Sequence, residues 1–370
     1  MNQSPLHGFH VELGAKMVDF AGWSMPVMYR GIVEEHRHTR QACSLFDVSH
    51  MGRVYVCGQD AERLLQRVCT RDVGEMAEGL SRYTHICRED GGILDDVIVS
   101  RYADRFLVVC NASNREKIVA WLSRYAAGQD VVIEDRTTES AMVALQGPEA
   151  LPEMQRLLNV DLSGLKRYHF QQQVFMTFPC SIFRSGYTGE DGAEIVLPVN
   201  LVKLAMSAML GLGHQEDQVI KPAGLGARDS LRLEAGMPLY GHELTEERDS
   251  LSAGQGWCVH LDRKEFIGAE ALRRLKAAGL KYCLVGLELA GRRTARQGFA
   301  VCAEGARIGV VTSGVLSPTL GRSIAMAMVD VAFAGEGTRL AVELGGKAVE
   351  AVVVKLPFYK RTKRAQAAVG

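Results

Sequence analysis

Short apolar runs alternate with amphipathic stretches along most of the chain, and this pattern predicts a protein of mixed helices and strands. Between residues 53 and 139, runs rich in Val, Ile and Tyr predict strands, and stretches with apolar residues at helical spacing predict helices. The expected strands are residues 54–57, 83–87, 93–101, 106–110 and 131–135, and the expected helices are residues 61–69 and 113–126. The turn signal Glu-Asp-Gly-Gly at residues 89–92 favours an antiparallel hairpin over a parallel sheet.

The segments on either side of this unit are mixed as well. Residues 1–52 contain one clear helix, at 32–42, and residues 140–250 combine strands with helices. In the second segment the expected strands are residues 142–145, 174–178, 182–184 and 194–197, and the expected helices are residues 148–158, 201–210 and 223–234.

The last hundred residues have a different pattern. After a linker and a helix at 269–278, short β-rich runs lie between glycine-rich turns. These runs are residues 283–289, 307–312, 324–331 and 349–355. Such a section is typical of an all-β domain. The sequence therefore predicts the α+β class with an all-β C-terminal domain.

Length and charge narrow the function classes. A chain of 370 residues is long enough for two or three domains. Its 43 Lys and Arg residues balance its 43 Asp and Glu residues, so there is no global positive field to collect nucleic acid or an anionic membrane. No apolar run approaches the roughly 20 residues of a membrane-spanning helix, and the N-terminus has no signal-peptide pattern. We expect a cytoplasmic protein that binds neither nucleic acid nor a membrane.

Several kinds of site are not indicated. There is no Walker A loop, no G-x-G-x-x-G and no G-x-S-x-G, so neither a nucleotide cofactor nor serine-hydrolase chemistry is expected. The nine cysteines are scattered and never spaced as C-x-x-C, which is typical of small buried side chains in a reducing compartment. His36 and His38 point about 200° apart on a helix, so we expect packing or surface roles for them and no metal.

Three polar segments lie in apolar surroundings. Asp95 and Asp96 open an otherwise apolar strand, where one carboxylate faces a pocket or both end the hairpin in water. The glycine-dense loop at residues 185–194 allows close approach of a ligand or forms a tight turn with surface acids. Arg228 and Arg232 share one helix face, as an anion site or as partners of nearby acids.

Seven motifs resemble, in order, the aminomethyltransferase (T protein) family of the glycine cleavage system. They include Phe-Ala-Gly-Trp-Ser-Met-Pro-Val at 20–27 and Gly-Gly-Ile-Leu-Asp-Asp at 91–96. The others are residues 46–51, 186–191, 227–236, 253–257 and 312–321. The resemblance extends over about residues 6–358.

This resemblance implies a three-domain cloverleaf around a central folate site. The first domain, which binds folate, is discontinuous (1–52 plus 140–255), and an antiparallel α/β domain (53–139) is inserted into it. A linker and helix (256–280) lead to a jelly-roll-like β-barrel (281–370). The implied reaction transfers the methylene carbon of an aminomethyl group, carried by lipoylated H protein, to tetrahydrofolate as co-substrate. Ammonia and 5,10-methylene-tetrahydrofolate are released.

The resemblance also implies site residues. Asp96 matches the family's acidic residue, whose fixed charge orients the folate amines and stabilises cationic character as ammonia leaves. Glu194 matches the carboxylate that holds the amino edge of the pterin, and Arg228 a binding-site arginine. The remaining expected folate contacts are Tyr83, Asn111, Tyr168, Tyr187 and Tyr359.

Two other functions remain open for this fold. One is a folate-binding accessory role in iron–sulfur cluster maintenance, whose K-G-C-Y-x-G-Q-E signature is missing at residues 249–256. The other is a folate-dependent demethylase component whose flavin lies on a separate subunit.

Two positions depart from the family pattern, and three arginines are candidates for contact with H protein. Met28 stands where Gln is usual, and Ala269 stands where Lys is common, which would alter a surface used by H protein. For docking of an acidic H protein we expect a local basic patch of Arg292, Arg293 and Arg296.

Overall fold

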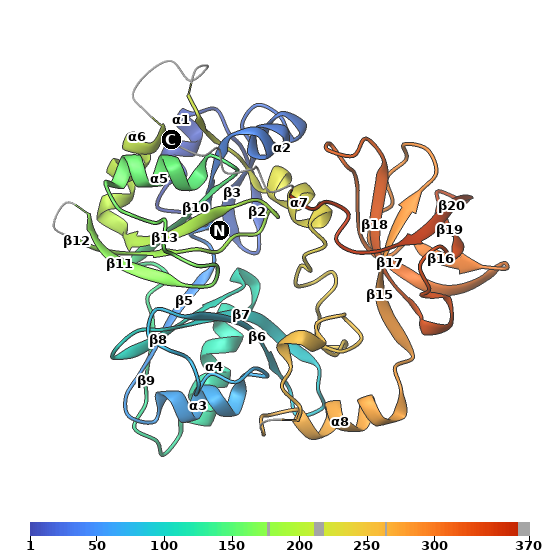
Figure 1. Cartoon of the computed structure of the whole chain (residues 1–370), viewed down its shortest axis with the longest axis horizontal. Coiled ribbons are helices and arrows are strands. Elements are labelled where there is room, and N and C mark those ends of the chain that lie inside the picture. Colours follow the sequence, from blue (N-terminus) through green and yellow to red (C-terminus); the bar gives the residue numbers. More distant parts are fainter. Residues whose placement is uncertain (176–177, 211–217, 263–264, 362–370) are drawn as a thin grey trace, which may run out of the picture.

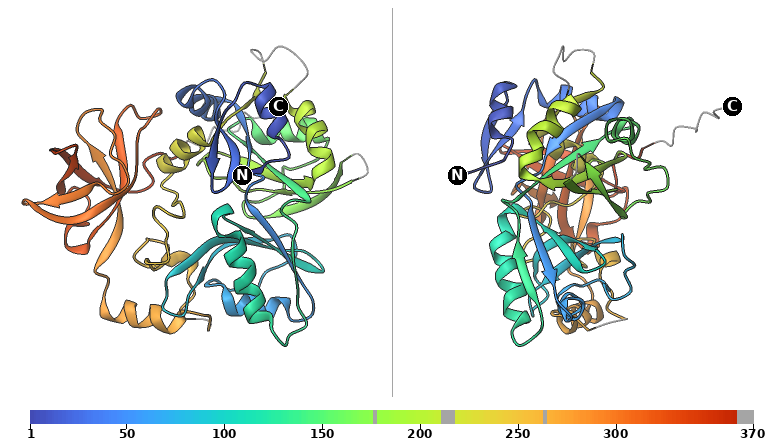
Figure 2. Two further views of the ribbon diagram at one scale, coloured as in Figure 1. Left: turned by 180° about the vertical axis from the view of Figure 1, so that it is seen from behind. Right: turned by 90° about the vertical axis from the view of Figure 1, so that its left-hand side faces the viewer.

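The chain folds into three units arranged around a common centre, as the computed structural model shows (Figure 1). The structure describes residues 1–175, 178–210, 218–262 and 265–361. Seen from the side, the three units lie in one layer (Figure 2). No helix in these described ranges is long and apolar enough to cross a lipid bilayer.

The first unit is built on a six-stranded sheet with the order β11-β12-β13-β10-β4-β14. Its strands are β4 (Cys43–Asp47), β10 (Ser140–Gln146), β11 (Phe170–Phe175), β12 (Phe178–Phe183), β13 (Gly192–Pro198) and β14 (Ile220–Pro222). A small sheet beside it contains β1 (Asn2–Gln3), β2 (Lys16–Phe20) and β3 (Trp23–Met28). The helices are α1 (His7–Glu12), α2 (Ile32–Gln41), α5 (Ala150–Leu158), α6 (Val202–Leu210) and α7 (Leu225–Glu234), with a short 3₁₀ turn, η2 (Val199–Leu201).

Alternating residues of this sheet serve two different cores, because neighbouring side chains on a strand point to opposite faces. Leu45 and Val143 pack with α5 and α6 on one face. Phe46 and Met142 pack on the other face against α7 and against residues of the second unit. The second face therefore joins the first and second units.

The second unit is an antiparallel sheet with the order β6-β7-β8-β5-β9. Its elements are β5 (Gly52–Cys57), α3 (Ala61–Val68), β6 (Ser81–Cys87), β7 (Ile93–Arg101), β8 (Arg105–Cys110), η1 (Ala112–Asn114), α4 (Arg115–Ala126) and β9 (Val132–Asp135). The apolar residues of α3 recur at helical spacing and are buried against the sheet together with Ile118 of α4.

The third unit is a closed six-stranded barrel with the order β15-β18-β17-β16-β19-β20. The linker that joins α7 to the barrel, residues 235–281, contains η4 (Gly256–Cys258) and α8 (Ala269–Ala278). Its elements are β15 (Tyr282–Leu289), β16 (Ala300–Ala303), β17 (Ala306–Leu316), β18 (Ser323–Asp330), η5 (Val331–Phe333), β19 (Arg339–Leu344) and β20 (Lys347–Val354).

After β20 the chain returns to the first unit. The Tyr359 backbone N–H donates to the Glu234 carbonyl at the end of α7, over 2.8 Å. Leu233 of α7 packs against Ile324 and Met326 of the barrel in one buried cluster. The barrel is thus attached to the first unit both through its linker and through its last residues.

The predicted α+β class with an all-β C-terminal unit is confirmed. Strands before and after residues 52–135 share one sheet, which supports our proposed division of the chain with the second domain inserted into the first.

Some predicted elements are wrong or missing. The single strand predicted at 174–178 does not exist, because β11 ends at Phe175 and β12 begins at Phe178, while residues 176–177 lie outside the described ranges. Strand β11 lies at the edge of the sheet, and its polar residues Gln171–Gln173 do not show the apolar alternation by which a strand is predicted. The unpredicted strands are β1, β2, β3, β4, β14, β16 and β19.

Candidate functional site

The turn before β7 brings the linker close to the acid pair. Gly91 has a φ of +89°, which favours glycine. A Cβ on Gly92 would lie 2.1 Å from the Glu246 carbonyl oxygen, so only glycine allows the linker to pack there. The Ile93 N–H then donates to the Arg248 carbonyl over 3.0 Å. The Gly-Gly motif thus fixes the linker beside the first residues of β7.

Asp95 is completely buried. Its Oδ1 accepts hydrogen bonds from the side-chain amides of Asn111 and Asn114, both over 2.7 Å. Its Oδ2 accepts from the Asn111 backbone N–H over 2.9 Å. Burial, and then the neighbouring Asp96 carboxylate, raise the pKa of Asp95. The alternative in which both carboxylates end the hairpin in water is therefore wrong.

Asp96 is held at both carboxylate oxygens and is still partly exposed. The Tyr83 hydroxyl donates to Oδ2 over 3.1 Å, and the Asn111 amide donates to Oδ1 over 2.8 Å. Burial raises the pKa of Asp96, and these two hydrogen bonds oppose the rise. Each oxygen keeps lone-pair capacity for a further donor.

Asn111, expected as a folate contact, also contacts the acid pair. Its side-chain NH₂ donates to Asp95 and to Asp96, so its donor capacity is directed at the acid pair. Asn111 therefore positions the two carboxylates.

An aromatic surface lies next to Asp96. The ring of Trp257, in η4, stacks on Tyr83 with centroids 5.4 Å apart and planes 18° apart. The Trp257 side chain is exposed, and the Arg71 guanidinium carbon lies 5.6 Å from the centroid of its ring. Burial and then the Asp96 charge raise the pKa of Tyr83 well above its usual value, so the phenol keeps its proton and donates.

The glycine-dense loop and α7 bring a second group of predicted residues together. The Arg228 guanidinium carbon lies 4.9 Å from the centroid of the Tyr187 ring, and the Tyr187 hydroxyl donates to the Pro238 carbonyl. Burial lowers the pKa of Arg228, while the nearby Glu194 carboxylate raises it. Glu194 is nearly buried, and its Oε2 accepts from Ser185 over 2.5 Å.

The two arginines of α7 have different roles. Arg232 is fully engaged with Asp229 (2.8 Å), Glu243 (2.9 Å) and Ser313 (2.8 Å). In contrast, the Nη1 of Arg228 is buried and has no hydrogen-bond partner among the described residues. A buried guanidinium nitrogen without a partner is costly, which points to a ligand atom at this position.

Arg40 of α2 contacts the glycine-dense loop at residues 185–194. Its Nη1 donates to the Thr188 carbonyl over 2.7 Å and to Glu190 over 2.9 Å, and its Nη2 donates to Glu234 over 2.9 Å. The Tyr359 ring lies 4.0 Å from the Arg40 guanidinium carbon. The loop is thus fixed against α2, and Glu190 is a buried ion-pair partner rather than a solvated surface acid.

The structure brings some of the predicted site residues into contact with one another, but not all of them. It brings Asp96, Tyr83 and Asn111 into direct contact and sets Arg228 on Tyr187. Tyr168, with a φ of +59°, instead joins the first two units, because its carbonyl accepts from the Ser81 N–H over 2.7 Å.

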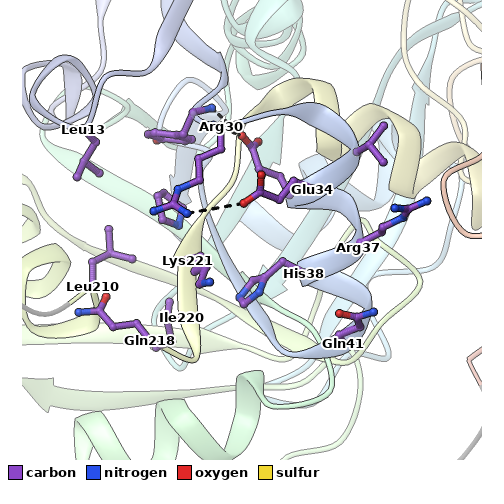
Figure 3. Close-up of a pocket in the computed structure, with 14 residues that line it drawn as sticks. Leu13, Arg30, Glu34, Arg37, His38, Gln41, Leu210, Gln218, Ile220 and Lys221 are labelled. Carbon is purple, nitrogen blue, oxygen red and sulfur yellow. Dashed lines mark hydrogen bonds and ion pairs between the residues drawn. The ribbon is translucent and has the colours of Figure 1, made fainter. Parts of the chain in front are cut away.

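His36 and His38 have the expected packing roles. His36 is buried and contacts Ser230 (2.7 Å) and Thr319 (2.9 Å). His38 faces the other way, into a pocket of about 500 Å³ between α2 and β14 (Figure 3). Arg30 and Glu34 pair across the same pocket over 3.8 Å. The residues that line this pocket do not include Asp95 or Asp96. The candidate functional site is therefore the region around Asp96, whose carboxylate is held by Tyr83 and Asn111.

Comparisons with known proteins agree along the whole chain. Residues 6–263 match the GCVT N-terminal domain, and residues 283–360 match the glycine cleavage T-protein C-terminal barrel domain. An aminomethyltransferase of Rubrobacter xylanophilus is 48% identical over 98% of this chain and 95% of its own. One of Herpetosiphon aurantiacus is 45% identical over 97% and 99%.

A solved structure shows the same fold. The glycine cleavage system aminomethyltransferase T from Bartonella henselae is 36% identical, with a TM-score of 0.91 over 97% of this chain and 98% of its own. The chain belongs to the glycine cleavage T-protein family. The predicted recognition, enzyme class and activity, an aminomethyltransferase of the glycine cleavage system, are confirmed, and neither alternative function is favoured.

The family assignment also bears on the two departures. Ala269 is only 1% exposed at the start of α8, and its effect on a surface used by H protein stays a prediction. Met28 ends β3 and is half-buried.

Sequence reasoning missed several residues of this T-protein site. His85 could have been found, because it lies two positions from Tyr83 in a predicted strand and so shares its face. Trp257 could also have been found, because it lies in a motif of the family resemblance. Asn114 and Ser250 gave no such signal, because their contacts cross 19 and 165 positions of the chain.

Proposed function

We propose that the chain transfers the methylene carbon of an aminomethyl group, carried on the lipoyl arm of H protein, to tetrahydrofolate. Ammonia, 5,10-methylene-tetrahydrofolate and dihydrolipoyl H protein are the products. The observation that carries the proposal is the Asp96 carboxylate, fixed by Tyr83 and Asn111 and still partly exposed. A preorganised negative charge of this kind stabilises positive charge that develops as an amine leaves.

Glu194 and Arg228 fit the polar edge of a pterin. In our proposal the Glu194 carboxylate accepts from the amino edge, where two N–H donors face two oxygens. The unpartnered Nη1 of Arg228 donates to an acceptor on the same ligand. When bound, tetrahydrofolate supplies the amine nitrogens that take up the one-carbon unit.

Aromatic residues complete the proposed binding site. The stacked pair of Tyr83 and Trp257 offers a flat apolar surface, and Tyr187 lies beneath Arg228. On the family resemblance we also keep Asn111, Tyr168 and Tyr359 in the proposed folate-binding set.

We propose that H protein docks on the segment between β15 and β16. Arg292, Arg293 and Arg296 are all exposed there and form a basic patch that suits an acidic partner. Reversal of these charges to Glu is expected to raise the KM for H protein and leave folate affinity unchanged. Equal loss of both would contradict this docking surface.

We also propose a cytoplasmic location. It is supported by the nine cysteines, six of which are buried, as is common for proteins of a reducing compartment.

The test of the activity is ammonia release from aminomethyl-loaded H protein, with and without tetrahydrofolate. We expect strongly folate-dependent release with methylene-tetrahydrofolate formed in parallel. The Asp96→Asn variant should bind folate and lose most of its turnover. Folate binding without ammonia release by the wild-type protein would contradict the transferase and favour the accessory role, and full turnover of Asp96→Asn would contradict the role of Asp96.

A further inference from the structure

A line of buried polar groups leads from the linker to Asp96. Tyr83 and His85 lie two positions apart on β6, so their side chains share one face of the strand. The His85 Nε2 lies 3.2 Å from the Tyr83 hydroxyl, and its Nδ1 lies 2.7 Å from the hydroxyl of Ser250 in the linker. His85 and Ser250 are both completely buried.

The directions of these hydrogen bonds follow from their chemistry. An ionised Asp96 can only accept, so the single hydroxyl proton of Tyr83 points to Asp96. The Tyr83 oxygen must then accept from the Nε2–H of His85. Burial lowers the pKa of His85 to about 3, so at neutral pH its ring carries one proton. Its Nδ1 therefore accepts from Ser250.

We propose that His85 and Ser250 are positioning residues for the transfer reaction: they keep Tyr83 as a donor to Asp96 and so keep that carboxylate oriented and ionised. The inference rests on the proposed function of Asp96. Ser250 sets which nitrogen of His85 carries the proton, and His85 in turn fixes the direction in which the Tyr83 hydroxyl donates. Neither residue is placed in contact with the substrates.

The linker is fixed beside β7 without the Ser250 hydroxyl. The Ile93 N–H bonds to the Arg248 carbonyl, and the Asp249 carboxylate accepts from the backbone of Leu251 and Ser252, both over 2.8 Å. Removing the Ser250 hydroxyl therefore interrupts the line of hydrogen bonds with little effect on the backbone around it.

The experiment compares His85→Phe, His85→Gln and Ser250→Ala with the wild-type enzyme. Phe fills the site without a donor, whereas Gln supplies an amide N–H to Tyr83. Ser81→Ala is the matched control, because it removes a buried serine hydrogen bond on the same strand (Ser81–Ser100, 2.7 Å) outside this line. The readouts are kcat, the dissociation constant of tetrahydrofolate, the thermal midpoint, and the pH profile of kcat.

We expect His85→Phe and Ser250→Ala to lower kcat about tenfold, the effect of one well-placed hydrogen bond, with folate affinity unchanged. The acid limb of the pH profile should move to higher pH, because a weaker donor leaves the Asp96 carboxylate less stabilised. Partial recovery is expected for His85→Gln, and wild-type kcat for Ser81→Ala.

The titratable groups around Asp96 are Asp95, Tyr83, His85, Tyr187 and Cys258.

Two results would overturn the inference. One is an unmoved acid limb in His85→Phe and Ser250→Ala. The other is a loss of kcat that only parallels a loss of thermal stability, as a purely structural role predicts. Asp96→Asn and the wild-type enzyme are measured beside them. If Asp96→Asn is inactive while His85→Phe behaves as wild type, the inference fails and the proposed function stands. Wild-type turnover of Asp96→Asn defeats the role of Asp96 on which the inference rests, and only absence of folate-dependent ammonia release by the wild-type enzyme defeats the proposed function itself.

Discussion

The side-chain amide of Asn111 lies 2.8 Å from Oδ1 of Asp96 and holds that carboxylate from the end of the neighbouring strand β8. The same NH₂ group reaches Asp95 over 2.7 Å. Two acids on one strand are thus tied together by a single amide, and the geometry of Asp96 depends on a residue 15 positions away.

Replacing Asn111 by Ala should therefore damage catalysis more than folding. Loss of a donor to a charged group costs about 1.5–3 kcal/mol, which corresponds to roughly 10- to 100-fold in kcat if it is expressed in the transition state. Steady-state turnover measures the effect. The matched variant Asn114→Ala removes a donor to Asp95 alone, and it should lower thermal stability while changing kcat by less than about threefold. Equal kcat losses in both variants would show that Asp95, and not Asp96, carries the effect.

Glu194→Gln tests the pterin edge. The change keeps the size of the side chain and removes a charge that we propose faces two N–H donors, so folate affinity should fall about 10- to 100-fold. Isothermal titration measures the affinity. Asp191→Asn is the control in the same loop, since Asp191 pairs with Arg184 over 3.0 Å. If both variants lose affinity alike, the cause is the loop and not the Glu194 carboxylate.

Arg40→Met should destabilise the first unit. Arg40 is 7% exposed and donates to Glu190, Glu234 and the Thr188 carbonyl, so its loss leaves buried acceptors without a cation. The expected loss of unfolding free energy is about 3 kcal/mol. Urea unfolding measures it. Arg156→Met removes an exposed pair with Glu153 and should cost less than about 0.5 kcal/mol. Similar costs for the two variants would contradict a structural role for Arg40.

His50 should make the fold sensitive to acid. Burial lowers its pKa from 6.5 to about 4, and its Nδ1 has no partner among the described residues. Below pH 6.5 the unfolded chain takes up this proton while the folded chain does not, so stability is complete above pH 6.5 and falls as the pH drops toward 4. The expected loss over this range is about 3 kcal/mol. Denaturant unfolding of wild type and His50→Phe at several pH values should give a smaller decline for the variant. Parallel curves would exclude His50 as the cause.

Local patterns predicted the elements that carry most of the site. The turn at residues 89–92, the strand 93–101 and the helix 61–69 follow from side-chain spacing, which is a local property. Strand β4 was missed because all five of its residues are buried and so show no polar alternation, and because it follows directly on α2. Strands β11 and β12 were misjudged because the end of β11 and the start of β12 were interpreted as one strand.

The contacts that give site residues their roles are mostly non-local. His36 meets Glu234 at a separation of 198 positions, and Ser250 meets His85 at 165. The spacing of apolar and polar residues along the chain cannot predict contacts between residues so far apart in sequence. The family resemblance supplied Asp96, Glu194 and Arg228, but it did not reveal that the Asn111 amide is already used by the acid pair or that Arg232 is fully paired while Arg228 is not.

The return of the chain from the barrel to α7 limits how the third unit can move. A domain joined by one linker is free to rotate about it, but this barrel is fastened at its entrance by residues 249–258 and at its exit by the Tyr359–Glu234 backbone bond and the Arg361–Asp191 ion pair. Rotation would require one of these attachments to break. The barrel is therefore expected to move with the first unit as one body, and removal of the Arg361–Asp191 ion pair should loosen the attachment at its exit.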